Sequence, residues 1–503
     1  MRERAYLRQR YAAIFSAVGL TFLIAAGVML LPLSMLPAYP EEAGHATAFL
    51  FPAGCLALLG VFLARICRVP SLSDLSVEEG GVIVLISWSV VILFSAWPFV
   101  SILKLPFSRA LFESVSGWTT TGLSVVDVVQ AGPLILFWRS LTQFAGGAGL
   151  AVIMMSAIVG PTGVGISSAE GRAEQLAPQI RQSARLVMII YSSYAASGIL
   201  AYWLAGMSPF DAVNHAFAAV STGGFSTRAA SIGHWNSAAV EWVTLPLMLL
   251  GNLSFVTAWL LWRGKFRMVG RSGEIHLLAL LIPSSAAALF MFTCRAIYPN
   301  LDESIRVAVF QTFSAMTTTG FSTVGYGNWN GFGMLLLILL MLIGGGTCST
   351  AGGIKQFRVY LFLKLLFWEL RRHLLPRTAV LERPVWEGDE RVFVDDGMVR
   401  QAAVFIFLYL STWLLGALVL CACGYTLSDS LFEFASAVGT VGLSVGITSP
   451  RMADAALWAE IFGMFLGRLE FIVVIAGLLK LCTDMKSAVA KTAQRESVKI
   501  LDK

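Results

Sequence analysis

The sequence predicts an all-α polytopic membrane protein built from four pseudo-symmetric repeats. Of its 503 residues, 57% are hydrophobic and only 13% are charged, and the mean hydropathy is +0.74. These values are typical of a chain whose main surroundings are lipid. Apolar stretches that can cross a bilayer recur along the chain, and a Thr-x-Gly motif occurs four times between them.

The apolar stretches give about ten predicted transmembrane spans. Each comes near or above the roughly 20 residues that a helix needs to cross the hydrocarbon core. The stretches cover approximately residues 12–36, 46–64, 82–103, 134–159, 187–205, 240–262, 275–292, 331–367, 402–423 and 455–482. A basic, loop-like insert over residues 371–400 separates the eighth stretch from the ninth.

Basic residues orient these spans, because Lys and Arg concentrate in short cytoplasmic loops. The first ten residues contain four arginines, every second loop after them is strongly basic, and so is the C-terminal tail. We therefore expect both termini in the cytoplasm and all four Thr-x-Gly motifs outside. The same pattern explains the net charge of +6 without a nucleic-acid partner, since the basic residues flank apolar spans.

The four motifs share Thr-x-Gly followed by Leu or Phe and then Ser. They lie at residues 119–124, 221–226, 317–322 and 439–444. The glycine permits a backbone conformation that a residue with a Cβ resists, so hydroxyl and backbone oxygens of each copy can face one point. Four such loops around one axis can coordinate a dehydrated cation. Four exterior turns without a ligand are the alternative, which the repetition at matching topology disfavours.

A short segment precedes each motif and is expected to form a half-length pore helix. The predicted N-terminal caps are Ser108, Ser208, Asp302 and Ser428. Such a helix would run inward and point its partly negative C-terminal end at the motif, which favours a cation there.

With these motifs, the chain resembles the Trk/Ktr/HKT family of potassium transporters, and within it the bacterial Trk-type translocating subunit. The resemblance covers essentially the whole chain. It is carried by Trp-Thr-Thr-Thr-Gly-Leu-Ser at 118–124, Thr-Thr-Gly-Phe-Ser-Thr at 318–323, the glycine-rich segment at 344–355 and Leu-Gly-Arg-Leu-Glu at 466–470.

The resemblance implies potassium uptake across the bacterial inner membrane through one pore. It implies a two-helix segment over residues 1–79 and membrane-pore-membrane repeats over 80–175, 176–271, 272–398 and 399–503, the third with an intramembrane loop. It further implies a homodimer and a cytoplasmic nucleotide-binding regulatory subunit of the TrkA type. Potassium is the substrate, and no organic cofactor is expected on this chain.

The predicted selectivity filter consists of stacked carbonyl rings. In plant relatives of the family, a serine in place of the first-repeat glycine goes with sodium transport, so Gly122 favours potassium. A sodium-permeable or weakly selective channel or symporter is the alternative, and the sequence leaves coupling to protons or sodium open. The predicted potassium-binding residues are Thr120, Thr121, Gly122, Thr222, Gly223, Gly224, Thr318, Thr319, Gly320, Thr440, Val441 and Gly442.

A glycine-rich segment is predicted to form a flexible gate below the filter. Five glycines in ten residues disfavour a helix by about 1 kcal/mol each relative to Ala, and non-helical backbone at membrane depth must be buried in protein or line water. A kinked helix packed through small residues is the alternative, whereas the spacing Gly-Ile-Lys excludes a phosphate-binding loop. The predicted gate residues are Gly344, Gly345, Gly346, Thr347, Ser349, Thr350, Gly352 and Gly353.

Arg468 completes the predicted gate, near the middle of the stretch 455–482. A charge at the bilayer centre costs at least about 2.5 kcal/mol, so it should face the bundle interior or water. Glu470 lies on a different helical face and is a poor partner. The resemblance places Arg468 in the permeation path as a charge barrier. A structural arginine bonded to carbonyls of a neighbouring repeat is the alternative, and both roles can coexist.

No residue pattern predicts an enzyme. An intramembrane enzyme would need clustered His, Asp or Glu, or a nucleophile beside a base, and the sequence offers neither. The five histidines are scattered without metal-ligand spacing, and His215 is interpreted as a packing residue of the second pore helix. The seven cysteines lie mostly in apolar stretches and are interpreted as small hydrophobic residues.

Overall fold

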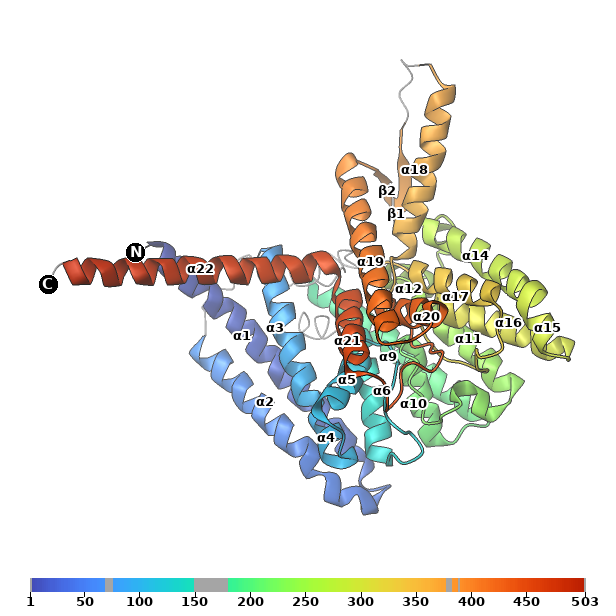
Figure 1. Cartoon of the computed structure of the whole chain (residues 1–503), viewed down its shortest axis with the longest axis horizontal. Coiled ribbons are helices and arrows are strands. Elements are labelled where there is room, and N and C mark those ends of the chain that lie inside the picture. Colours follow the sequence, from blue (N-terminus) through green and yellow to red (C-terminus); the bar gives the residue numbers. More distant parts are fainter. Residues whose placement is uncertain (1, 68–75, 149–179, 377–381, 388–389, 502–503) are drawn as a thin grey trace.

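The computed structural model describes residues 2–67, 76–148, 180–376, 382–387 and 390–501 as a helical membrane protein (Figure 1). The chain begins with a helical pair, α1 (Arg2–Leu30) and α2 (Thr47–Ile66), joined through the 3-10 helices η1 (Leu31–Met35) and η2 (Pro40–His45). Gly19 and Gly60 face each other where the two helices meet, since a Cβ on either would come within 2.8 Å of the other's carbonyl oxygen. The missing side chains allow this close approach.

Four groups of helices follow, each with a long first helix, a short helix and a second helix. The first group is α3 (Val77–Ser95) with α4 (Trp97–Leu103), α5 (Phe107–Trp118) and α6 (Pro133–Ala148); the second is α9 (Ile180–Leu204), α10 (Pro209–Val220), η3 (Ser231–Trp235), α11 (Ala238–Asn252), α12 (Phe255–Trp262) and α13 (Phe266–Val269).

The third group carries the glycine-rich loop between its last two helices. It comprises α14 (Gly273–Leu289), η4 (Phe290–Cys294), α15 (Arg295–Ile297), α16 (Leu301–Met316), α17 (Gly331–Ile343) and α18 (Gln356–Leu374); the fourth is α19 (Asp396–Ala422), α20 (Leu427–Val438), α21 (Asp454–Leu469) and α22 (Phe471–Leu501).

The insert between the third and fourth groups is more ordered than the expected loop. Helix α18 continues through Leu374, and β1 (Pro384–Glu387) pairs with β2 (Glu390–Phe393) as an antiparallel hairpin. Figure 1 shows the hairpin and the end of α18 projecting from the helical body.

Six helices of the described residues are long and apolar enough to span a membrane, or up to eight if each of two bent pairs counts as one span. The remaining two stretches of the ten expected are not among these spans. The stretch 331–367 is interrupted after α17, which has only 13 residues, and part of the stretch 134–159 lies outside the described residues. The all-α polytopic fold is thus as predicted.

The short helices preceding the motifs have 12 residues, or 16 in α16. The cap prediction is right for Ser208, whose side chain accepts a hydrogen bond from the amide of Asp211. It is wrong for the other three, which lie within the first turn. The cap positions are Pro106, Asn300 and Thr426, and of these only Thr426 caps through its side chain.

The second helices of repeats two and four break partway along their length. Helices α11 and α12 meet at 113°, and α21 and α22 meet at 98°. The second break falls at Glu470, whose φ is +56°. Arg468, expected near the middle of the stretch 455–482, therefore lies in the last turn of α21, directly before the break.

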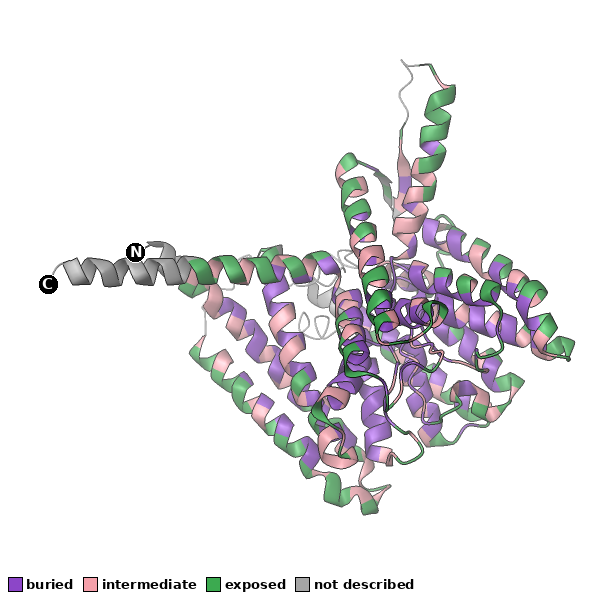
Figure 2. Ribbon diagram, viewed as in Figure 1, coloured by how far each residue is buried: buried purple, intermediate pink, exposed green. Residues whose placement is uncertain are grey.

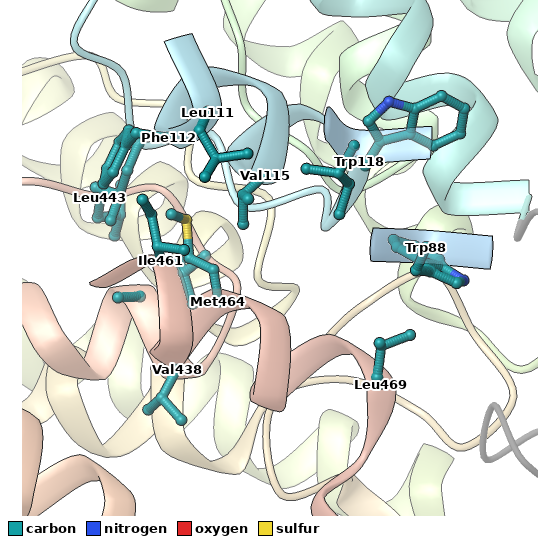
Figure 3. Close-up of a cluster of buried hydrophobic side chains, with 14 of the residues drawn as sticks. Trp88, Leu111, Phe112, Val115, Trp118, Val438, Leu443, Ile461, Met464 and Leu469 are labelled. Carbon is teal, nitrogen blue, oxygen red and sulfur yellow. The ribbon is translucent and has the colours of Figure 1, made fainter. Parts of the chain in front are cut away.

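The short helices lie in the core and are mostly buried after their first turn, whereas the outer helices expose apolar side chains (Figure 2). Exposed apolar faces such as that of Leu58 and Phe407 fit a surface covered by lipid. Figure 3 shows Leu111, Phe112 and Val115 of α5 packed near Ile461 and Met464 of α21. The fourth repeat therefore packs against the first, and the repeats close into a ring.

Candidate ion pathway

The four Thr-x-Gly loops share one unusual backbone conformation. In each copy the first and third residues have left-handed φ values, while the residue between them does not. The third is always a glycine, for which this conformation is easy. The first is always a threonine, for which it is uncommon. These threonines, Thr120, Thr222, Thr318 and Thr440, have φ between +48° and +55°, and the glycines, Gly122, Gly224, Gly320 and Gly442, have φ between +75° and +97°.

The amide groups of each loop bond back to the pore helix that precedes it. The N–H of the first residue donates to a carbonyl three residues earlier at 3.0–3.2 Å, and the N–H of the second donates to a carbonyl five residues earlier at 2.8–3.0 Å. The four pore helices thereby hold all four loops in the same way. Since the amide groups of each loop face its own pore helix, its carbonyl groups can face away from that helix.

The loops touch one another in cyclic order. A Cβ added to the glycine of one copy would collide with the carbonyl oxygen of the second residue in the next copy. This holds for Gly122 against Gly223, Gly224 against Thr319, Gly320 against Val441, and Gly442 against Thr121. The second-residue carbonyls therefore surround one axis, and the twelve predicted filter residues are brought together. Each of these positions therefore requires glycine twice over, for its positive φ and for the lack of space for a Cβ.

An open cavity of about 530 Å³ lies over this ring. All four loop glycines line it, together with the serine two positions after each: Ser124, Ser226, Ser322 and Ser444. The ring therefore forms the floor of a vestibule.

A buried polar residue stands nine positions before each loop glycine and bonds to the segment that follows the same loop. Its side chain contacts a hydroxyl group at 2.6–2.9 Å in every copy. The pairs are Glu113 with Ser124, His215 with Ser226, Gln311 with Tyr326, and Glu433 with Ser444. The packing interpretation of His215 missed this bond. The constant offset of nine residues is the sequence signal that could have indicated it.

The predicted gate residues lie together directly beneath the ring, in a loop between α17 and α18. The amide of Gly352 donates to Thr318 Oγ1 at 2.8 Å, and Thr222 Oγ1 lies 3.2 Å from Thr350 Oγ1. Thr350 Oγ1 also donates to the carbonyl of Gly251 at 2.8 Å. The C-terminal half of the loop thus contacts Thr222 of repeat two and Thr318 of repeat three.

The loop is held at its base as well. Gly344 and Gly353 have positive φ values, and a Cβ on Gly344 would lie 2.6 Å from the Cα of Gly353. Near them, the amide of Gly345 donates to Gly352 O at 3.0 Å, and that of Thr347 to Glu274 Oε1 at 2.7 Å. Together with the bonds of Gly346 to Asn252 O and of Ser349 to Gly346 O, these contacts fix the loop in one buried conformation.

Arg468 joins the loop to the first repeat. Its Nη1 donates to the carbonyl of Thr350 at 2.7 Å, and its Nη2 donates to that of Gly146 at 2.7 Å. Glu470 instead pairs with Arg358 at 3.0 Å. The positive charge therefore lies under the ring, and its hydrogen bonds connect the third repeat with the first. This position is compatible both with a charge barrier and with a structural role.

The first-residue threonines differ in what their hydroxyl groups contact. Those of Thr222 and Thr318 bond to the loop beneath, whereas in the described structure the buried hydroxyls of Thr120 and Thr440 have no hydrogen-bond partner. A buried oxygen without a partner is costly, and a cation is one ligand that such an oxygen can take. Among the described residues, no group of three His, Cys, Asp or Glu side chains could hold a metal ion.

Comparisons with known proteins agree with this architecture. The sequence profile of the TrkH family, described as a cation transport protein, matches residues 67–486. The chain is 32% identical to the Trk system potassium uptake protein TrkH of Halomonas elongata, over 80% of this chain and 85% of the relative. It is 31% identical to an uncharacterized cation transporter of Methanocaldococcus jannaschii, over 85% and 87%.

A solved structure has the same overall fold. The crystal structure of the potassium transporter TrkH from Vibrio parahaemolyticus superposes with a TM-score of 0.81 at 27% sequence identity. The match covers 94% of this chain and 98% of that one.

Proposed function

This chain belongs to the TrkH family of cation transport proteins, and we propose that it takes up potassium through a single pore with a carbonyl-lined selectivity filter. The observation that carries the proposal is the closed ring in which each loop glycine meets the next loop's carbonyl. The relatives of Halomonas elongata and Escherichia coli are named potassium uptake proteins, which supports potassium as the substrate.

The ring supplies what a dehydrated cation needs. Carbonyl oxygens of the first and second filter residues replace water molecules in two layers, and the threonine hydroxyls add a third layer below. The C-terminal ends of the four pore helices carry partial negative charge and point at this ring, which favours a cation over an anion. No side-chain carboxylate is needed to attract the ion.

The loop and Arg468 gate this pathway. An ion that leaves the filter inward meets Thr350 and Gly352, which contact the filter threonines, and then the guanidinium of Arg468. A positive charge in surroundings of low dielectric constant repels a cation much more strongly than it would in water. The conformation described here is accordingly a closed one, and conduction requires the loop to move.

Regulation from the cytoplasm fits the same arrangement. We place both termini, the C-terminal end of α18 and the β1–β2 hairpin on the cytoplasmic side, and a nucleotide-binding subunit of the TrkA type would act there on a homodimer. Helix α18 begins at Gln356, directly after the loop, and Gln356 Nε2 donates to Gly344 O at 3.0 Å. A displacement of α18 would therefore be transmitted to the loop through Gln356.

Cation flux into proteoliposomes tests the proposal. Purified protein would be compared with protein-free vesicles for potassium, rubidium, sodium and lithium, with and without an imposed pH gradient. We expect potassium and rubidium to enter faster than sodium and lithium. Equal rates for all four ions would favour the weakly selective alternative, dependence on the pH gradient would indicate coupled transport, and no flux above the empty vesicles would contradict the proposal.

A further inference from the structure

The second filter residue is different in repeat two. It is Thr121, Thr319 or Val441 in the other copies but Gly223 here, so one of four equivalent side chains is missing. The second helices of the repeats show a matching difference at their eleventh residue. Helices α11, α17 and α21 carry Met248, Met341 and Met464 there, whereas α6 carries Gln143, and all four side chains are fully buried.

The two differences meet in space. Gln143 Nε2 donates to the carbonyl oxygen of Gly223 at 2.5 Å, and the amide of Phe225 donates to Gln143 Oε1 at 3.1 Å. A Cβ on Gly223 would collide with the Gln143 carboxamide, its oxygen being 2.5 Å away. The carboxamide of α6 thus occupies the space into which a filter side chain would project, with both of its ends hydrogen-bonded.

The backbone at Gly223 is less restricted than in the other copies, so a contact that fixes its carbonyl matters more here. It is followed by Gly224, so this copy alone has two successive glycines in the filter, and a glycine pair has more conformational freedom than Thr-Gly or Val-Gly. The Gly223 carbonyl also lies against Gly122 in the ring. A shift of this carbonyl would change one of the four oxygens of its layer.

We propose that Gln143 is a positioning residue for ion selectivity, holding the Gly223 carbonyl in the ring in place of the missing side chain. The proposal rests on the filter assignment made above. A carbonyl oxygen has two lone pairs, so the bond from Nε2 leaves one for the cation. Gln143 therefore acts through Gly223 and does not itself touch the ion.

The test is a double-mutant cycle that gives Gln143 of repeat one and Gly223 of repeat two the residues found at the equivalent positions of the other repeats. Gln143→Met, Gly223→Thr and the double variant would be purified and assayed for potassium-over-sodium flux. We expect Gln143→Met to lower that ratio about fivefold or more, the scale of a lost buried hydrogen bond. Gly223→Thr should be at least as defective because of the collision, and the double variant should recover most of the ratio. Gln130→Met, in an exposed position, is the matched control.

The outcomes separate this inference from the proposed function. A wild-type protein without selective flux would overturn the filter assignment itself. A selective wild type with a well-folded Gln143→Met variant that keeps the ratio within twofold would overturn only the role of Gln143. If Gln143→Met does not assemble, the double variant is compared with Gly223→Thr alone, and equal loss of selectivity in these two would overturn the proposal.

Discussion

At the scale of single residues, two independent demands require glycine at the third position of each Thr-x-Gly loop. Gly122 needs a φ of +93°, and the space beside its Cα is taken by the carbonyl oxygen of Gly223. The sequence predicted the first demand from the repeated motif. It could not predict the second, because a collision between copies depends on which repeat is the neighbour of which. The pairing of Gln143 with Gly223 was missed for the same reason.

Replacing Gly122 with Ser should lower potassium-over-sodium selectivity and leave insertion largely intact. The added Cβ must displace the Gly223 carbonyl, which disturbs one layer of the ring while the pore helices remain anchored. Growth of a potassium-uptake-deficient strain at low potassium would be scored beside sodium flux. Gly54→Ser in α2, where a Cβ meets nothing within 4 Å, is the control. Unchanged selectivity in the Gly122 variant would argue against a filter at this position.

Arg468 combines a charge with a structural tie, and two substitutions separate these roles. Arg468→Ala removes both, so potassium flux should rise if the charge limits conduction. Arg468→Lys keeps the charge but loses the planar guanidinium that spans Thr350 and Gly146, so its flux should stay nearer wild type. Flux per correctly inserted molecule is the measurement. If both variants lose yield without a gain in flux, Arg468 serves only as the tie.

At the scale of elements, the second helices share a glycine that hydropathy does not reveal. The fourteenth position counted from the start of α6, α11, α17 and α21 is Gly146, Gly251, Gly344 and Gly467. Three of them lie against a carbonyl near the C-terminal end of the pore helix in the same repeat, at Trp118, Val220 and Val438. In α11 and α21 the helix breaks just after this position, and α17 ends directly before it. Hydropathy did not predict those breaks, because it depends only on composition and carries no information on the direction of the helix axis.

Adding one methyl group at this shared position should loosen the repeat. In Gly251→Ala the new Cβ would lie 2.6 Å from the carbonyl oxygen of Val220, and such overpacking typically costs about 1–3 kcal/mol. We expect a lower midpoint of thermal unfolding in detergent, with Gly54→Ala unaffected. An unchanged midpoint for Gly251→Ala would mean that α11 can move away from its pore helix at no cost.

At the scale of the whole molecule, four unequal repeats enclose one axis, and among the described residues only the third carries a glycine-rich loop beneath the ring. Composition, hydropathy and motif repetition were sufficient to predict the all-α fold, the four copies and the position of the loop. They did not predict that the loop bonds to the threonines of two different repeats, or that Arg468 of the fourth repeat reaches the first. These contacts join residues 34, 128 and 322 positions apart, so no local pattern records them.

Deleting the loop tests whether it gates the pathway, as proposed. Because Gly344 and Gly353 adjoin at the base of the loop, deletion of residues 345–352 should let α17 rejoin α18 with little strain, and deletion of the full segment 344–353 provides a second variant. With Thr350 and Gly352 gone, the pathway below the filter is no longer obstructed. Potassium flux should therefore rise, and its dependence on a regulatory partner should weaken.

Two measurements keep this result interpretable. The midpoint of thermal unfolding shows whether the protein remains stable once Thr222 and Thr318 have lost their contacts with the loop. The potassium-over-sodium flux ratio shows whether the proposed filter still selects. Since Arg468 loses its bond to Thr350 in the deletion, combining it with Arg468→Ala should add little further flux if the loop is the main barrier. A deletion variant that inserts normally and conducts at the wild-type rate would remove the gating role and leave the loop as a packing element between repeats.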